Sequence, residues 1–117
     1  MTDCDPDCLF CRIVAGKIPS DRVHEDDEVV AFRDINPQAP THVLAIPRRH
    51  IADAAALTEG DGPLLERLFA VLRDIAEDEG LDTGYRIVTN VGPDAGQTVF
   101  HLHLHLLGGR SMGWPPG

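Results

Sequence analysis

The chain has 117 residues, the length of a single domain, and no apolar run in it is long enough to cross a membrane. Its formal net charge of −9 would repel a phosphate backbone, so we expect neither nucleic acid nor a membrane as a partner. The acidic start MTDCDPDC does not resemble a signal peptide, and three clustered cysteines favour a reducing, cytoplasmic location.

The first half of the sequence predicts an acidic tail, a short helix and three strands. Residues 1–7 are expected to be flexible, ahead of a single domain over 8–117. Apolar residues at helical spacing predict a helix over about 8–15, which Gly16 ends. Alternating and β-branched runs predict strands at 22–26, 28–34 and 42–47.

The second half predicts one long helix and two further strands. Leucines at i, i+3, i+4 and i+7 spacing predict a helix over about 62–79, with Asp61 as its N-cap and Gly80 at its end. Strands are expected at 85–91 and 99–107, followed by an irregular tail over 108–117. The expected fold class is α+β, an approximately five-stranded, mostly antiparallel sheet covered by helices on one face.

The stretch HLHLHLL places three histidines at alternate positions of the last predicted strand. Side chains in a strand alternate between faces, so His101, His103 and His105 share one face and the leucines share the other. An exposed polar face would not require imidazole, so the pattern favours chemistry. The outer pair is separated by roughly 13 Å along a regular strand, too far for three ligands of one zinc ion. At least one imidazole therefore remains for nucleophilic or proton-transfer chemistry.

The loop NVGPDAGQT precedes the histidines and is suited to an anion. Gly92 and Gly96 allow sharp turns that expose amide groups, while Asn90, Gln97 and Thr98 add neutral donors. A glycine-containing loop is more often only a turn. Its position directly before the histidine strand strengthens the functional interpretation.

These motifs resemble the histidine-triad (HIT) superfamily, whose signature His-x-His-x-His-apolar-apolar is met by HLHLHLL. The similarity continues through DINPQAPTHVLAIPRRH, GYRIVTNVGPDAGQT, LLGGR and WPPG, over about residues 8–117. The AGQT loop and the tail are similar to the Hint branch, the purine nucleoside phosphoramidases. The resemblance implies a homodimer with a sheet continuous across the interface, and hydrolysis of the P–N bond in AMP- or GMP-type nucleoside phosphoramidates.

The resemblance also implies roles for particular residues. His103 would be the nucleophile that forms a covalent nucleotidyl-histidine, His105 would polarise the phosphate, and His42 would orient the nucleophile or pass a proton. The remaining implied contacts to substrate are Ile13, Ile18, Phe32, Asp34, Ile35, Asn90, Gly96, Gln97, Thr98 and Trp114. Phe32 and Ile13 are expected to be core residues as well, and Asp34 could be only a turn cap. Thr98 stands where many relatives have serine, which leaves the preference for the amine open.

The pair Cys8–Cys11 forms a CxxC motif, which needs two more ligands to hold zinc. Bacterial members of the family that the chain resembles combine such a pair with two histidines, which here correspond to His50 and His101. A zinc ion in this site would be structural and would fix the N-terminal helix to the sheet. Cys4 is expected to be a tail thiol that could compete for the ion.

Three alternatives remain open at the level of the sequence. One is another HIT activity, such as dinucleoside polyphosphate hydrolysis or nucleotidyl transfer, against which the WPPG tail argues. A second is a non-catalytic nucleotide- or zinc-binding interaction protein, which would not need a nucleophile. The third is a zinc hydrolase that uses the triad as ligands, which the spacing of the histidines disfavours.

Overall fold

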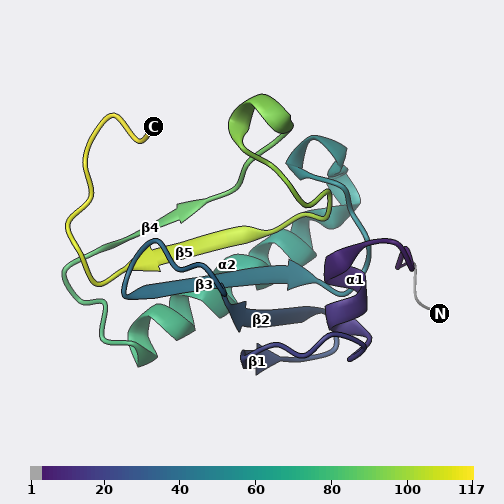
Figure 1. The fold of residues 1–117 in the computed structure, drawn as a ribbon, viewed down its shortest axis with the longest axis horizontal. Helices are drawn as coiled ribbons and strands as arrows, with labels where there is room; N and C mark the ends of the chain where they lie inside the picture. The colour runs from purple at the N-terminus through teal and green to yellow at the C-terminus, as the bar shows by residue number, and fades with distance from the viewer. Residues whose placement is uncertain (1–3) are drawn as a thin grey trace.

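A computed structural model describes residues 4–117, and its centre is a five-stranded antiparallel sheet (Figure 1). The strand order is β1-β2-β3-β5-β4, so the strand that carries His105 lies between β3 and the edge strand β4. The strands span Arg22–Glu25 (β1), Val29–Arg33 (β2), Thr41–Pro47 (β3), Tyr85–Val88 (β4) and Leu104–Gly108 (β5). The expected α+β fold class is confirmed. No helix within residues 4–117 has the length and apolar character needed to cross a membrane.

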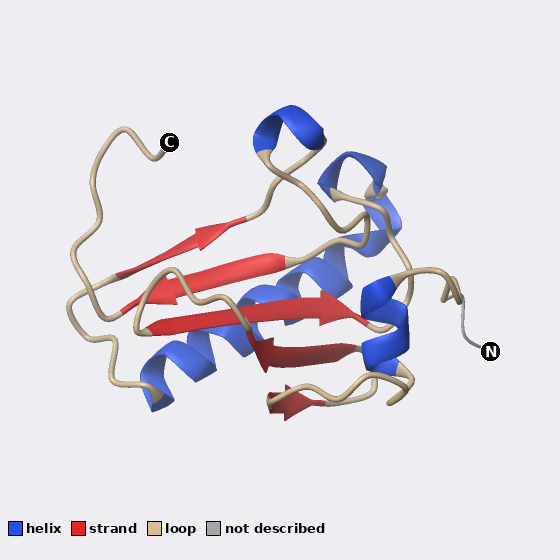
Figure 2. Cartoon of the chain, viewed as in Figure 1, coloured by secondary structure: helices blue, strands red, loops and turns tan. Residues whose placement is uncertain are grey.

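The two main helices lie on opposite faces of the sheet (Figure 2). The long helix α2 (Gly62–Asp78) covers one face, where its leucines pack on Val43, Ala45 and Leu104. The short helix α1 (Leu9–Val14) covers part of the other face, where Phe10 packs against Phe32. The expectation that helices cover only one face is therefore wrong, because both faces of the central strands carry buried apolar side chains.

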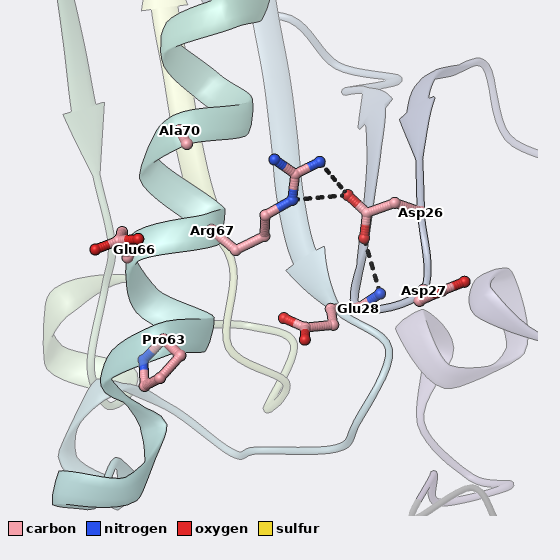
Figure 3. A pocket seen from close by; sticks show the side chains of 7 residues that line it. All are labelled: Asp26, Asp27, Glu28, Pro63, Glu66, Arg67 and Ala70. Carbon is pink, nitrogen blue, oxygen red and sulfur yellow. Dashed lines mark hydrogen bonds and ion pairs between the residues drawn. The ribbon is translucent and has the colours of Figure 1, made fainter.

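Helix α2 follows the predicted span closely, but its N-terminus is held in a different way. Asp61 occupies the N-cap position without capping the helix, because its carboxylate accepts from the Thr58 amide and from Arg49. Gly80 ends the helix region with a positive φ of 70°. Arg67 donates two hydrogen bonds to Asp26 in the β1–β2 turn, which ties α2 to that turn (Figure 3).

The last two strands are shorter than the sequence predicts. Strand β5 begins at Leu104 instead of residue 99, because the Leu102 amide donates to the Ile51 carbonyl and draws the preceding segment out of the ladder. Strand β4 ends at Val88 instead of residue 91, where the hydroxyl of Thr89 donates to the His103 carbonyl. The connections contain three short 3₁₀ turns, at Ala54–Ala56, Glu59–Asp61 and Pro93–Ala95.

The N-terminal segment makes specific contacts from residue 4 onward. The Cys4 thiol donates to the Arg48 carbonyl, the Asp5 amide donates to the Cys11 sulfur, and Arg12 donates to the Pro6 carbonyl. The described part of the predicted tail is therefore attached to the domain. The prediction for residues 1–3 lies outside the described residues.

Candidate active site and metal centre

The histidine row keeps the predicted alternation although its first part precedes the strand. Leu102, Leu104 and Leu106 are buried in the core beneath α2. His101 and His103 are also buried, on the α1 side, and their rings both contact Phe10 edge-on. The histidines therefore lie in two environments. His101 lies beside the N-terminal part of α1, and His105 lies within the sheet.

His103 is held in one tautomer by the backbone. Its Nδ1 lies 2.7 Å from the His101 carbonyl oxygen, which can only accept, so Nδ1 carries the proton. When the ring is neutral, Nε2 therefore keeps its lone pair. The His103 carbonyl accepts a hydrogen bond from the Thr89 hydroxyl at 2.8 Å, and Phe10 packs against the ring with centroids 5.0 Å apart. Backbone and packing together fix the ring with the lone pair of its neutral form on Nε2.

A hydrogen-bond chain sets the opposite tautomer in His105. The Gln38 amide donates to Nδ1 of His42 at 3.0 Å, so the neutral His42 ring carries its proton on Nε2. That nitrogen lies 2.9 Å from Nδ1 of His105 and donates to it. The proton of His105 is then on Nε2, the nitrogen that faces away from His42. The chain Gln38–His42–His105 therefore makes His105 a hydrogen-bond donor at the site.

The register of the sheet brings His42 and His105 together. His42 pairs with Leu107 across the β3–β5 ladder, and His105 pairs with Leu44. The two histidines are thus diagonal neighbours on the same face, a distance that side chains of this size can bridge. Their rings lie 5.1 Å apart, and the His103 and His105 rings lie 5.0 Å apart.

Burial favours the neutral form of His42 and His105. Burial lowers the pKa of His105 to about 4, with smaller contributions in the same direction from His103 and His42. Burial also lowers the pKa of His42, although the carboxylate of Asp34 opposes the shift. Both rings are therefore neutral near pH 7, as the hydrogen-bond chain requires.

Asp34 is positioned as a turn residue beside the histidine cluster. One carboxylate oxygen accepts from the Asn36 amide at 2.8 Å, and the other lies 3.5 Å from Nε2 of His42. The carboxylate is partly exposed, with 20% of its side-chain area accessible. The turn-cap interpretation is confirmed, and the exposed part of the carboxylate leaves room for a further hydrogen bond.

Most donors of the loop before the histidines bond within the loop itself, and one bond of Gln97 reaches the Ala52 carbonyl. Gly92 and Gly96 have φ values of 84° and 94°, as the predicted sharp turns require. The amides of Gly96 and Gln97 donate to carbonyls inside the turn. The buried Gln97 side chain accepts from the Gly92 amide and donates to the Ala52 and Val99 carbonyls. Gln97 therefore shapes the loop, and the phosphate contacts expected from Gln97 and from the Gly96 amide stay predictions.

The predicted nucleoside-binding residues are divided between the core and the surface. Phe32 and Ile13 are buried in the α1-side core, where Ile18 packs against them, which confirms the core interpretation. Ile35 is fully exposed, Thr98 is exposed and Asn90 is partly buried. Trp114 is 83% exposed, and the Arg86 guanidinium of edge strand β4 lies 5.9 Å from its ring centroid. The loop and tail residues are thus available to a ligand or a second chain.

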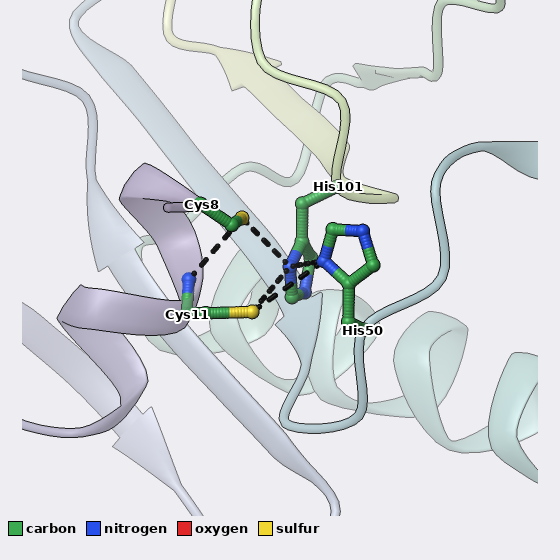
Figure 4. Close-up of side chains that lie close together, drawn as sticks. All are labelled: Cys8, Cys11, His50 and His101. Atoms are coloured by element: carbon green, nitrogen blue, oxygen red, sulfur yellow. Dashed lines mark hydrogen bonds between the residues drawn. The ribbon is translucent and has the colours of Figure 1, made fainter. Parts of the chain in front are cut away.

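The second cluster consists of Cys8, Cys11, His50 and His101, whose side chains converge between α1 and the sheet (Figure 4). Nδ1 of His101 lies 3.4 Å from each cysteine sulfur and 3.2 Å from Nδ1 of His50. The Cys11 sulfur lies 3.4 Å from the same His50 nitrogen. Two sulfur and two nitrogen ligands arranged tetrahedrally around zinc would be separated by roughly 3.3 to 3.8 Å. The described side chains therefore fit a zinc ion with little rearrangement.

The protonation pattern of the cluster also suits a metal. Nε2 of His101 lies 2.8 Å from the Pro47 carbonyl and donates to it, so Nδ1 directs its lone pair at the two sulfurs. Burial lowers the pKa of His101 to about 4, which keeps the ring neutral. Without a metal, burial raises the pKa of Cys8, and burial together with the Cys4 thiol raises that of Cys11 to about 11. A bound cation would replace the thiol protons.

Several partners that fix this site are not identifiable from residue types. The carbonyls of Pro47 and His101 accept from ring nitrogens, and backbone carbonyls have no signature in a sequence. The Gln38 amide has a weak signature, because it lies between Pro37 and Pro40, which lack an amide proton. Thr89 was not predicted, and nothing in its local sequence indicates its bond to the His103 carbonyl.

The comparisons with known proteins agree with this geometry. The family profile described as "Scavenger mRNA decapping enzyme C-term binding" matches residues 7–114. A HIT-like protein from Synechococcus elongatus is 52% identical over 95% of this chain and 97% of its own length. A 14 kDa zinc-binding protein from Zea mays is 49% identical over 97% of this chain and 90% of its own length.

Solved structures show the same similarity in three dimensions. A HIT family hydrolase from Legionella pneumophila Philadelphia 1 superposes with a TM-score of 0.93 and 52% identity, covering 95% of this chain and all of that one. A histidine triad nucleotide-binding protein from Candida albicans gives a TM-score of 0.80 at 33% identity, covering 93% of this chain and 83% of that one. Sequence, fold and the His-x-His-x-His row together show that the chain belongs to the histidine-triad superfamily.

Proposed function

We propose that the protein is a nucleotide-binding hydrolase that cleaves the P–N bond of purine nucleoside 5′-phosphoramidates through a covalent nucleotidyl-His103 intermediate. The observation that carries the proposal is the hydrogen bond from Nδ1 of His103 to the His101 carbonyl. It fixes the tautomer that a nucleophile needs before substrate arrives, and such preorganisation lowers the barrier to attack. The names of the Legionella and Candida relatives support a hydrolase and a nucleotide ligand, respectively.

In the first step, Nε2 of His103 attacks the α-phosphorus and the P–N bond breaks. The amine leaves with the electron pair of that bond and takes up a proton from water. His105 donates from Nε2 to a phosphoryl oxygen, where negative charge builds up, and His42 holds His105 in that tautomer. Thr98 contributes its hydroxyl on the loop side, and Gln97 acts by shaping the loop.

In the second step, a water molecule attacks the same phosphorus. The bond between phosphorus and Nε2 breaks, which releases a nucleoside 5′-monophosphate and returns the imidazole with its lone pair. The partly exposed carboxylate of Asp34 is suited to accept from ribose hydroxyls. Phe32, Ile13 and Ile18 form the apolar floor beside it, with Ile35 at the rim. Asn90 completes the sugar-phosphate side.

We also propose that Cys8, Cys11, His50 and His101 hold a structural zinc ion. Zinc in a closed site of four protein ligands supplies folding free energy instead of an open position for substrate. Its ligands come from α1, from the segment after β3 and from the start of the histidine row, so the ion would join three parts of the fold. The zinc-binding name of the Zea mays relative supports this assignment.

A homodimer joined at edge strand β4 completes the proposal. The outer side of β4 has no strand partner within the described residues, and Tyr85 and Trp114 expose large aromatic surfaces beside it. An exposed strand edge is a template for pairing with a second chain. Trp114 would then be close to the partner's site, as the resemblance implies.

The test incubates the protein with adenosine 5′-phosphoramidate and compares His103→Ala with His24→Ala. His24 is a matched control, because its ring bonds to Asp26 in the β1–β2 turn, away from the histidine row. The wild type and His24→Ala should release AMP, whereas His103→Ala should not. Acid-free quenching and mass spectrometry should locate an adenylyl adduct on His103.

Four outcomes would count against the proposal. Turnover by His103→Ala at the wild-type rate would show that His103 is not the nucleophile. An adenylyl adduct on another residue would assign the nucleophile to that residue. Hydrolysis of a dinucleoside polyphosphate in preference to the phosphoramidate would favour the alternative HIT activity. Binding of AMP without any turnover would favour a non-catalytic nucleotide-binding protein.

A further inference from the structure

Cys4 lies beside the metal cluster in a position that the fold specifies. Its thiol donates to the Arg48 carbonyl at 2.8 Å, across 44 positions of sequence, and it lines the same hollow as Cys11. Arg48 precedes the ligand His50 by two residues. The Cys4 sulfur is therefore next to one proposed ligand and next to the backbone that leads to another.

The segment after Cys4 is folded over Cys11. The Asp5 amide donates to the Cys11 sulfur at 3.3 Å, and the Asp5 carbonyl accepts from the Cys8 amide at 3.0 Å. The Arg12 side chain donates to the Pro6 carbonyl at 2.8 Å. These bonds keep Cys4 close to the cluster, so a change of ligand would need only a local movement.

The two histidines of the cluster are held unequally. Nε2 of His101 donates to the Pro47 carbonyl, and the ring is completely buried. His50 is half-buried, and its Nε2 has no hydrogen-bond partner within residues 4–117. Hydrogen bonds from the second ring nitrogen orient metal-binding histidines and strengthen their binding. His50 is therefore the ligand that leaves most easily.

We propose that Cys4 is an alternate zinc ligand that occupies the fourth position when His50 withdraws. The ion would then be held by Cys4, Cys8, Cys11 and His101. In this exchange the bond between zinc and Nδ1 of His50 breaks, the bond between zinc and the Cys4 sulfur forms, and the Cys4 thiol proton passes to water. The inference rests on the proposed zinc site and adds a second ligand set to it.

The chemistry of the surroundings suits a third thiolate. Zinc binds cysteine sulfur at about 2.3 Å and is common in sites with three cysteines and one histidine. The exchange adds one negative charge to the cluster. Arg12 and Lys17 line the hollow that contains Cys4 and Cys11 and would offset this charge, while Asp5 in the same hollow opposes it. At present Cys4 lies outside the four ligand atoms that are mutually within 4.8 Å, so it replaces His50 and does not join it.

The test substitutes cobalt(II) for zinc in the full-length protein, because the intensity of sulfur-to-cobalt absorption reports the number of bound thiolates. The wild type and Cys4→Ser should show the intensity of two thiolates. His50→Ala should show that of three, and Cys4→Ser/His50→Ala should return to two. An intensity of two thiolates in His50→Ala would overturn the proposal.

Zinc affinity, measured by competition with a chromophoric chelator, gives an independent readout. Cys4→Ser alone should leave the affinity unchanged, whereas adding it to His50→Ala should weaken binding by about 10-fold to 100-fold, the scale seen when support for a metal ligand is lost. Equal affinities of the single and double His50 variants would contradict the proposal.

Should His50→Ala be unfolded without metal, His50→Asn provides the second variant. Zinc should then restore its circular dichroism spectrum and melting transition, but should not restore those of Cys4→Ser/His50→Asn. Restoration of both, or of neither, would overturn the assignment of Cys4. Failure of the zinc proposal is recognised separately, because the wild type itself would then bind no cobalt or zinc, whatever its turnover of phosphoramidate.

Discussion

His101 and His103 are two residues apart, both buried and both packed on the ring of Phe10, yet they present opposite nitrogens. His101 donates from Nε2 to the Pro47 carbonyl and directs Nδ1 at two sulfurs. His103 donates from Nδ1 to the His101 carbonyl and keeps the lone pair on Nε2. The carbonyl that each ring meets therefore decides which nitrogen keeps its lone pair, as the proposed roles of metal ligand and nucleophile require.

The largest effect on turnover is expected for His103→Ala. Loss of the nucleophile should reduce turnover of adenosine phosphoramidate by about 10⁴-fold or more, as in enzymes whose covalent intermediate is removed. Zinc content should be unchanged, because no ligand is altered. Steady-state kinetics and metal analysis of the same preparation check this. A parallel loss of zinc would show that the zinc site and the nucleophile are not independent.

His101→Ala should show the converse pattern. Removing a buried ring and a ligand should lower the free energy of unfolding by about 3 kcal/mol or more. The melting temperature should fall by about 10 °C or more, the scale expected for a domain of this size. Thermal denaturation with and without chelator checks the result. If chelator abolished wild-type turnover at once without unfolding, the zinc-hydrolase alternative would gain support.

The hydrogen-bond chain through His42 begins at a backbone amide, that of Gln38, which a substitution can remove. Gln38→Pro removes the amide that donates to Nδ1 of His42, whereas Gln38→Ala keeps it. We expect Gln38→Pro to lower kcat by about 10-fold, a small part of the 10²–10⁴ that general acid–base groups contribute. Gln38→Ala should be close to wild type. Equal rates for the two variants would show that the tautomer of His42 is set in another way.

The neutral imidazoles also predict how stability depends on pH. The pKa of His105 is about 4 in the folded protein, below the usual value near 6.5, so the unfolded chain binds the proton more readily. Stability should therefore fall as the pH decreases from about 6.5 to 4. His105→Asn should show a shallower decline in urea unfolding over that interval. An unchanged slope would mean that His105 does not contribute.

The smallest effect is expected outside the histidine row, at Asp26. Burial works to raise the pKa of Asp26, but hydrogen bonds from His24, two backbone amides and Arg67 outweigh it and hold the pKa well below its usual range. Asp26→Asn should cost about 1 kcal/mol of stability near pH 7. The loss should disappear as the pH falls below about 4, where the unfolded carboxylate is protonated. Turnover and zinc content should not change.

Much of this protein was determined by local pattern in the sequence. The 3.6-residue spacing of leucines predicted α2 nearly to its ends, and the period of two predicted that Leu102, Leu104 and Leu106 would be buried opposite the histidines. The CxxC motif and the alternate histidines indicated members of both clusters, while His42 and His50 were implied by the resemblance to the family. Periodicity is readable because it depends only on the geometry of one element.

Only the tertiary structure decided which ring nitrogens in the two clusters are protonated. Whether Nδ1 or Nε2 of a ring is protonated depends on the carbonyl it meets, and the His101 and Pro47 carbonyls have no signal in residue type. The same reason explains Gln97, whose amide proved to be used by three backbone groups, and Cys4, which is held by a carbonyl from a distant strand end. Backbone groups are identical at nearly every position, so only the folded chain selects among them.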